Sequence, residues 1–201
     1  MRTVPTCAAI SSLFFAEIAA ADVYVFDNSV TYAAFCNDQS IVRQSQDLSQ
    51  LSSGSYAALT GGVGDFSWNL SAPSGVYLDS LGTARTQVNS EKLTLNFASS
   101  NVFAVGGYFF NVDGLGATKP GTMRIKLSDG TSFIRTVSNS TTFSGFVSDG
   151  ASISSVEVSH AGSFGAQHFV ATSGFIIGVV PAPGAVALLG LAGLAARRRR
   201  A

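Results

Sequence analysis

The chain has 201 residues, of which only 12% are charged, and it contains 21 glycines and 15 phenylalanines. A body of this length can bury a core as one domain. Few charges together with many Gly, Ser, Thr, Phe and Val residues are typical of a neutral all-β protein.

The formal net charge of zero hides an uneven distribution. Arg2 and the cluster Arg197–Arg200 account for five of the twelve basic residues, and Glu17 is one of the twelve acidic ones. Without the two ends, seven basic and eleven acidic residues leave the body with a net charge of about −4. Nucleic-acid binding needs Lys and Arg clustered on one face, so this composition excludes it.

The first 21 residues have the pattern of a secretory signal peptide. An apolar run at Cys7–Phe15 precedes small residues at Ala19 and Ala21, which fit a cleavage site that leaves Asp22 as the mature N-terminus. This predicts a signal helix over 1–21 and export by Sec-type machinery. A buried first strand or helix is the alternative, and Glu17 beside the apolar run favours it.

Cys36 is then the only cysteine of the mature chain, so no internal disulfide is predicted. A buried structural thiol is the simplest interpretation. Intermolecular pairing or a reactive thiol are the alternatives.

The first half of the body gives weak signals for secondary structure. We expect a strand at 23–26, a short helix beginning at Asn28 or Ser29, and a second, weaker helix within 38–51. Residues 53–87 are rich in turn-forming residues and predict loops with one short strand at 66–70.

The second half reads as strands. Residues 91–97 alternate apolar and polar side chains, and the apolar run 101–110 suits a central strand with a bulge or a close approach at Gly106 and Gly107. Residues 122–137 predict a hairpin that turns at Asp129–Gly130, and shorter strands follow at 142–147, 152–159, 167–171 and 174–178.

About ten short strands without βαβ alternation predict an all-β fold. We expect an antiparallel β-sandwich of jelly-roll type over 22–178, flanked by the signal helix and by a short C-terminal membrane helix within 179–201.

The C-terminal segment joins prolines, a short apolar stretch and an arginine cluster. Ala185–Ala196 would cover about 18 Å as a helix, against the ~30 Å hydrocarbon core of a bilayer. Because positively charged flanks stay on the cytoplasmic side, Arg197–Arg200 would remain in the cytoplasm while the body is exported. The stretch is therefore a poor permanent anchor by itself, and a single-pass protein kept in the inner membrane is the alternative.

This arrangement resembles the PEP-CTERM sorting signal of Gram-negative bacteria. The Pro-Glu-Pro of that family reads Pro181-Ala182-Pro183 here, followed by Gly184, the apolar stretch, and Arg197, Arg198, Arg199 and Arg200. The departure is Ala182 in place of glutamate, which leaves open which sorting enzyme reads the site.

The resemblance implies transient insertion into the inner membrane and removal of the helix and arginines by an exosortase-type transpeptidase. The body would then pass to the cell surface or an extracellular polysaccharide matrix. Residues 93–158 are also similar to bodies that PEP-CTERM proteins carry, which implies a sandwich fold and brings no catalytic residues.

The sequence contains no nucleophile elbow, phosphate-binding loop or dinucleotide fingerprint. The two histidines, His160 and His168, have no spacing typical of a zinc site. No cofactor is therefore predicted. A Ser-His-Asp constellation or a pair of carboxylates in a cleft would be needed for a hydrolase, which is a remote alternative.

Two sets of residues are candidates for binding. Tyr56, Tyr77 and Tyr108 could stack on sugar rings if exposed, and Trp68, Tyr56 and Tyr77 are the candidates for an aromatic platform, although packing in the core is the more common role of such residues. Asp27 and Asp113 lie beside turn residues and could bind Ca²⁺, although Asp is also simply a good turn residue.

From these observations we expect a secreted, non-enzymatic component of the cell envelope or matrix. The alternative is a module that recognises exopolysaccharide with the help of Ca²⁺. Exposure of Trp68 beside Tyr56 or Tyr77 would favour the module, and burial of all three would count against it.

Overall fold

The computed structural model describes residues 22–63, 66–162 and 168–180. The predicted signal peptide, the Pro181–Gly184 motif, the apolar stretch and Arg197–Arg200 lie outside these residues. Among the helices of the described ranges, none has the length and apolar character needed to cross a membrane.

The described chain is mostly β, and its paired strands are antiparallel, as the sequence predicts. The strands are β1 (Asp22–Phe26), β2 (Val42–Asp47), β3 (Gly54–Val63), β4 (Phe66–Leu78), β5 (Ala84–Thr86), β6 (Leu93–Phe97), β7 (Val102–Val112), β8 (Thr118–Lys119), β9 (Gly121–Leu127), β10 (Ser132–Val137), β11 (Phe143–Asp149), β12 (Ser155–His160) and β13 (Phe169–Val179). One helix, α1 (Ser29–Asp38), and a 3₁₀ turn, η1 (Leu48–Gln50), complete the elements.

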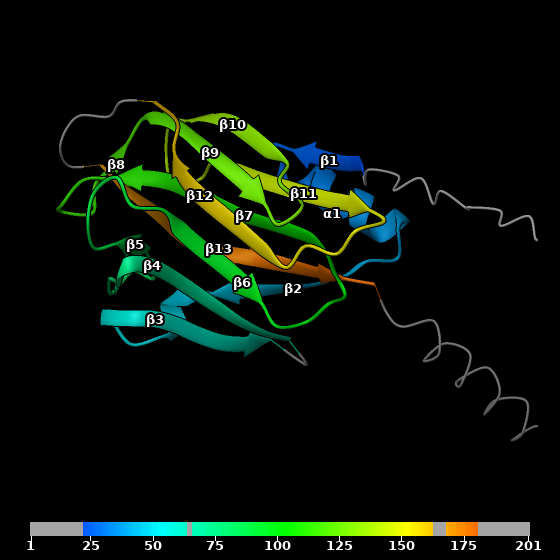
Figure 1. Ribbon diagram of the computed structural model, residues 1–201, viewed down its shortest axis with the longest axis horizontal. Helices are drawn as coiled ribbons and strands as arrows, with labels where there is room; N and C mark the ends of the chain where they lie inside the picture. Colours follow the sequence, from blue (N-terminus) through cyan, green and yellow to red (C-terminus); the bar gives the residue numbers. More distant parts are fainter. Residues whose placement is uncertain (1–21, 64–65, 163–167, 181–201) are drawn as a thin grey trace, which may run out of the picture.

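All thirteen strands belong to one hydrogen-bonded sheet that curls over on itself. The strand order is β1-β11-β7-β13-β5-β4-β6-β12-β9-β10, with β2 on β13, β3 on β4 and β8 on β7. Figure 1 shows β6, β12 and β9 crossing in front of β7 and β13. Strands that do not pair, such as β7 with β9 and β12 with β13, are also in contact, so the two halves of the sheet face each other as layers.

The long strand β4 carries the sheet from one layer to the other. Its first half pairs with β6 at Trp68–Ser71, and its second half pairs with β5 at Val76–Leu78. Pro73 and Gly75 lie between these halves, and Gly75 has a φ of +95° that favours glycine. The strand therefore changes partner across a segment that contains a proline and a left-handed glycine.

The main core fills the space between the layers. Alternating positions of the strands supply it, such as Leu93, Leu95 and Phe97 on β6 and Val105 and Phe109 on β7. Because successive side chains of a strand point to opposite faces, β7 can contribute to this core and also present its other residues to the outside of its layer.

Helix α1 covers part of that outer face and forms a second, smaller core. Tyr32 and Cys36, one turn apart on the helix, pack with Ala104, Phe143 and Val147 of β7 and β11. Asn28 caps the helix, because its side-chain Oδ1 accepts hydrogen bonds from the backbone N–H groups of Val30 and Thr31 at 2.7 and 3.3 Å.

The second predicted helix, within 38–51, is wrong. The segment forms β2 and then the single turn η1, and only the end of α1 overlaps the predicted range. β2 pairs along its whole length with β13, so backbone hydrogen bonds to a neighbouring strand outweigh the weak helical pattern of this segment.

The prediction of loops over 53–87 is also wrong, apart from the short strand expected at 66–70, which is the first part of β4. This segment contains β3, the thirteen-residue strand β4 and β5. Many of its Ser, Gly and Ala residues lie on exposed or half-buried positions of paired strands. The composition is therefore typical of a loop although the backbone is paired as a strand.

The remaining expectations agree with the structure in most respects. The strand at 91–97 is β6, the hairpin turning at Asp129–Gly130 joins β9 to β10, and the apolar run is the buried strand β7. The two short strands expected at 167–171 and 174–178 form one strand, β13, which is interrupted by a bulge.

Candidate functional site

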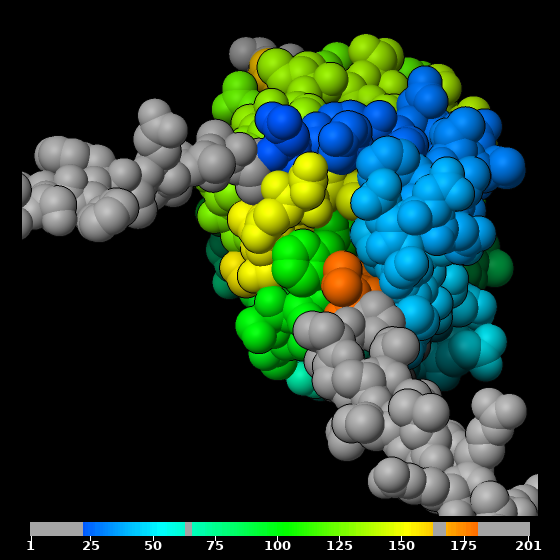
Figure 2. Space-filling model, turned by 90° about the vertical axis from the view of Figure 1, so that its right-hand side faces the viewer, coloured from blue at the N-terminus to red at the C-terminus, as the bar shows by residue number. Residues whose placement is uncertain are grey.

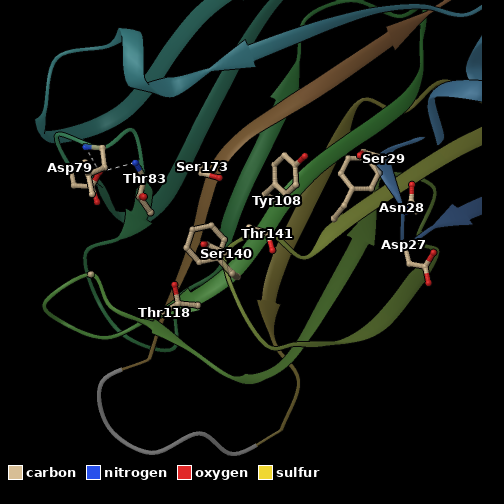
Figure 3. Close-up of a pocket in the computed structure, with 14 residues that line it drawn as sticks. Asp27, Asn28, Ser29, Asp79, Thr83, Tyr108, Thr118, Ser140, Thr141 and Ser173 are labelled. Atoms are coloured by element: carbon tan, nitrogen blue, oxygen red, sulfur yellow. Dashed lines mark hydrogen bonds between the residues drawn. The ribbon is translucent and has the colours of Figure 1, made fainter. Parts of the chain in front are cut away.

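A polar cleft of about 570 Å³ lies on the outer face of the layer that contains β7 and β13. The turns β1–α1, β4–β5 and β10–β11 and the β8 region form its rim (Figure 3). Its lining combines hydroxyls, carboxylates and aromatic rings: Asp27, Asn28, Ser29, Asp79, Leu81, Thr83, Tyr108, Phe110, Gly116, Thr118, Ser140, Thr141, Phe143 and Ser173.

Tyr108 on β7 is half-buried at the middle of the cleft. Its ring meets the Phe143 ring edge-on at a centroid distance of 5.6 Å, and Phe143 in turn packs on Tyr32 of α1 at 5.4 Å. This chain of aromatic contacts fixes the orientation of the Tyr108 ring. One part of the ring remains accessible from the cleft.

A bulge in β13 brings Ser173 beside Tyr108. The register with β7 shifts between Thr172, opposite Phe109, and Phe175, opposite Gly107. Two residues of β13 therefore oppose the single residue Tyr108. Bulges re-aim side chains, and this one places Ser173 in the cleft, as Figure 3 shows.

The β4–β5 turn forms one end of the cleft. The Asp79 carboxylate accepts hydrogen bonds through Oδ1 from the backbone N–H groups of Leu81 and Thr83, both at 2.8 Å. These bonds hold the turn in shape, and Gly82, with a φ of +81°, completes it. Asp79 thus brings a negative charge to this end on a well-ordered turn.

The start of α1 forms the opposite end. Asp27, Asn28 and Ser29 line the cleft there, with Tyr108 and Ser173 between them and Asp79 (Figure 3). Asp27, one of the two predicted calcium ligands, is therefore a cleft residue.

A second hollow of about 320 Å³ adjoins the cleft on the β2 side. It is lined by Ser45, Gln46 and Asp47 of β2, and it shares Tyr108 and Ser173 with the cleft. Ser45 and Asp47 are two residues apart on a strand, so they point to the same face.

Trp68 packs against Gln46 and Phe175, two residues of this hollow, and is only 2% exposed. Its ring meets Phe175 edge-on at 5.0 Å, and its indole N–H donates to Oε1 of Gln46 at 3.2 Å. Gly61 lies against the indole, where a Cβ would come within 2.4 Å of Cζ2. Trp68 therefore belongs to the core and holds Gln46 at the floor of the hollow.

The two other predicted platform residues are also away from the cleft. Tyr56 is half-buried on β3, and its hydroxyl donates to the Ser52 carbonyl at 2.6 Å. Tyr77 is 36% exposed on β4, and the guanidinium of Arg85 stacks on its ring at 5.0 Å and on the Phe169 ring at 4.8 Å.

Asp113, the second predicted calcium ligand, orders the β7–β8 turn. Its Oδ1 accepts from the backbone N–H groups of Leu115 and Ala117, both at 2.9 Å, and its Oδ2 lies 3.2 Å from the Lys119 ammonium. Hydrogen bonding from the Ala117 N–H and pairing with Lys119 lower the pKa of this carboxyl below its usual value. Within 22–63, 66–162 and 168–180, no cluster of three or more His, Cys, Asp or Glu residues could hold a metal ion.

The histidines meet at one end of the molecule. Nε2 of His160 lies 3.0 Å from the backbone carbonyl of His168, and their rings are 6.4 Å apart. Burial lowers the pKa of His160 below its ordinary value. Cys36 is a buried free thiol, as predicted, and burial raises its pKa, which makes the thiolate unfavourable.

A further groove, lined by Tyr24, Phe35, Phe103 and Val180 among others, lies where β1 begins and β13 ends. Figure 2 faces this end, where the orange end of β13 reaches the surface near the light-blue segment that contains α1. Its volume is about 320 Å³, and the Tyr24 and Phe35 rings touch in it at 4.8 Å.

The sequence indicates Asp27 and Tyr108 as candidates and gives no signal for the rest of the cleft. Tyr108, Ser173, Asp79 and Thr141 come from four separate parts of the chain, and no short motif links them. Tyr108 was the only one of them with a signal, as a lone polar-tipped aromatic within an otherwise apolar strand.

Comparisons with known proteins give little further information. The chain matches no protein-family model, and no curated protein matches it. A solved structure of a family 29 carbohydrate-binding module, described as a mutant used to probe ligand recognition, aligns with 68% of this chain and 92% of its own at 10% identity and a TM-score of 0.32. A similarity of this size assigns neither a fold family nor a ligand to the chain.

Proposed function

We propose that the folded body binds a polysaccharide in the cleft centred on Tyr108. The observation that carries this proposal is the half-buried Tyr108 ring, held in place by Phe143 and surrounded by side-chain hydroxyls and carboxylates. Sugar rings present an apolar face, which can stack on an aromatic ring, and a rim of hydroxyls that exchange hydrogen bonds with Ser, Thr, Asn and Asp.

The rest of the lining supports a sugar over other ligands. Phosphate-bearing ligands need Lys, Arg or a run of backbone N–H groups, and within 22–63, 66–162 and 168–180 no Lys, Arg or His lines the cleft. An extended peptide would add to an exposed strand edge, whereas this cleft lies over the face of paired strands.

A binding role without catalysis is part of the proposal. Asp27 and Asp79 lie at opposite ends of the cleft, with Tyr108 and Ser173 between them (Figure 3). A carboxylate pair that hydrolyses a glycosidic bond stands about 5 to 9.5 Å apart across that bond. We therefore expect no release of reducing sugar from any glycan that binds.

The proposal is tested by replacing Tyr108. Purified residues 22–180 should bind glycans on an array and in calorimetry, and Tyr108→Ala should weaken that binding at least about tenfold, since stacked aromatic residues dominate such sites. Tyr108→Phe keeps the ring and should retain most of the affinity.

Two controls separate a lost contact from lost folding. Tyr77→Ala removes an exposed tyrosine that does not line the cleft and should bind as the wild type does. Thr141→Arg adds bulk at an exposed rim residue and should block binding while the protein stays folded. Equal binding by wild type, Tyr108→Ala and Thr141→Arg would contradict the proposal.

The second part of the proposal concerns delivery and rests on the sequence. We infer that the chain is an exported protein of the cell envelope or extracellular matrix, with a jelly-roll type sandwich as its body. The Pro181-Ala182-Pro183 motif, the apolar stretch and Arg197–Arg200 would direct processing by an exosortase-type enzyme. Such sorting would place a polysaccharide-binding body next to its ligand.

Mass spectrometry of the C-terminal peptide from native cells tests this part. A peptide ending near Pro181 in the surface or matrix fraction is expected. Replacing Arg197–Arg200 by alanine should leave the uncut precursor in the cell. A peptide that still carries the arginines in the inner-membrane fraction would instead mean a single-pass anchor.

A further inference from the structure

The cleft and its neighbouring hollow form one continuous groove across the sheet. They share Tyr108 and Ser173, and together they extend from the β10–β11 turn over β11, β7 and β13 to β2. Adjacent strands lie about 4.8 Å apart, so the four strands alone span roughly 14 Å. A groove of this kind suits a chain of several linked sugars better than a single sugar or a chain end.

The charges along the groove have one sign. Asp27 and Asp79 lie at the two ends of the cleft, and Asp47 lies in the hollow on β2. Among the residues that the structure describes, no Lys, Arg or His lines either part. A bound cationic group would therefore meet three carboxylates, and a bound anionic group would meet no compensating charge.

Three nearby cationic side chains are engaged in other contacts. Arg43 of β2, on the same face as Asp47, donates to Oδ1 of Asn37 at 3.1 Å. The Arg85 guanidinium is stacked on Tyr77 and Phe169 and donates to the Gly114 carbonyl at 3.3 Å, and Lys119 is paired with Asp113. The backbone N–H of Ser49 donates to the Asp47 carboxylate and lowers its pKa, which favours the charged form. The carboxylates that line the groove therefore give it a negative field.

We propose that the groove selects a linear polysaccharide whose sugars carry free amino groups, such as a glucosamine polymer, and discriminates against uronic acid polymers. This inference rests on the proposed function and adds the charge and length of the ligand. The protonated amino groups would face Asp47, Asp79 and Asp27, while a sugar ring near the middle of the bound segment stacks on Tyr108.

The test compares four hexasaccharides by calorimetry with residues 22–180. They are β-1,4-linked glucosamine, its fully N-acetylated form, a neutral glucose hexamer and a galacturonic acid hexamer. The glucosamine hexamer should bind at least about tenfold tighter than the acetylated and neutral ones at low salt, because it alone carries positive charge, and added salt should remove most of that advantage.

The galacturonic acid hexamer should bind weakest. The glucosamine disaccharide should bind at least about tenfold more weakly than the hexamer.

Matched variants locate the effect. Asp47→Asn keeps the acceptor oxygen for the Ser49 N–H and removes only the charge, so it should reduce the ratio of glucosamine-hexamer affinity to neutral-hexamer affinity. Asp38→Asn removes an exposed carboxylate at the C-terminal end of α1, outside the groove, and should leave the preference unchanged.

The outcomes distinguish failure of the proposed charge and length selection from failure of the proposed polysaccharide binding. Equal or weaker binding of the glucosamine hexamer relative to the neutral hexamer would overturn the charge selection, and a disaccharide that binds as tightly as the hexamer would overturn the extended groove. In either case, binding that Tyr108→Ala abolishes would leave the proposed function standing. Absence of binding to all four hexamers and to the glycan array would overturn both.

Discussion

Gly106 and Gly145 sit opposite each other on β7 and β11, directly under the helix. A Cβ on Gly106 would lie 2.6 Å from Cζ of Phe143, and a Cβ on Gly145 would lie 2.7 Å from Cδ2 of Tyr32. The absence of side chains here lets the Tyr32 and Phe143 rings lie flat against the strands. The same rings support Tyr108 in the cleft.

We expect Gly145→Ala to destabilise the protein by about 1 to 3 kcal/mol, the usual cost of overfilling a packed core. The reason is that the new methyl group would press on the fully buried Tyr32 ring and, at 2.8 Å from Cε1, on the Phe143 ring. Chemical denaturation measured by fluorescence gives the change in the free energy of unfolding.

Gly114→Ala is the matched control, since the nearest atom to its Cβ would be Cε2 of Phe169 at 3.9 Å. Its stability should stay within about 0.5 kcal/mol of the wild type. A Gly145→Ala protein as stable as this control would show that the Tyr32 ring moves freely.

The sequence singles out Gly106 and Gly107 as a close approach, and the structure confirms close approaches at both. It could not have indicated Gly145, because the partner of Gly106 is set by the pairing of β7 with β11. The same limit applies to the cleft. Tyr108 is one of five tyrosines, and only the fold decides which of them is accessible beside polar groups.

At the scale of elements, α1 shows how a local signal can suffice. The sequence places its start at Asn28 or Ser29, and the structure confirms Asn28 as the N-cap. The cap also positions the end of the cleft formed by Asp27 to Ser29.

Asn28→Ala should lower the free energy of unfolding by about 1 kcal/mol, because two N–H groups of the first turn lose their acceptor. Asn28→Asp keeps an acceptor and should restore most of the loss. Thermal unfolding of the three proteins measures the difference. An alanine variant with unchanged stability would mean that water replaces the cap at no cost.

Strands β2 to β5 show where local signals fail. β2 is mostly polar, and β3 and β4 are rich in Ser, Gly and Ala, so hydrogen bonds to β13, β4 and β6 decide the conformation of these strands, of which the sequence predicts only 66–70. The later strands β6, β7, β9 and β10 carry strict alternation, long apolar runs or a turn at Asp129–Gly130, and for these the sequence alone was enough.

At the scale of the whole molecule, His160 links the two layers of the sheet. It ends β12 in one layer, and its Nε2 donates to the carbonyl of His168, the residue before β13 in the other. Its burial lowers its pKa below the ordinary value of 6.5. The unfolded chain therefore binds a proton at His160 more readily than the folded chain does.

By linkage, this contribution to stability is complete above about pH 6.5 and is lost as the pH falls toward the lower pKa of the folded state. The melting temperature should thus fall between about pH 7 and about pH 5. His160→Gln, whose side-chain amide can still donate to the His168 carbonyl, should show a smaller fall. Parallel pH profiles for the two proteins would refute the assignment.

The pairing of β13 along both of its edges determines how the sheet would resist a pulling force. It is hydrogen-bonded along both edges, to β7 on one side and to β2 and β5 on the other, and it leads directly to Val180. A pull on Val180 along the strand would strain the bonds of both edges together, in shear, so no single bond can yield first. Ser173 lies on the same strand, so one continuous, doubly paired segment of backbone joins the proposed binding cleft to Val180 and would transmit tension between them.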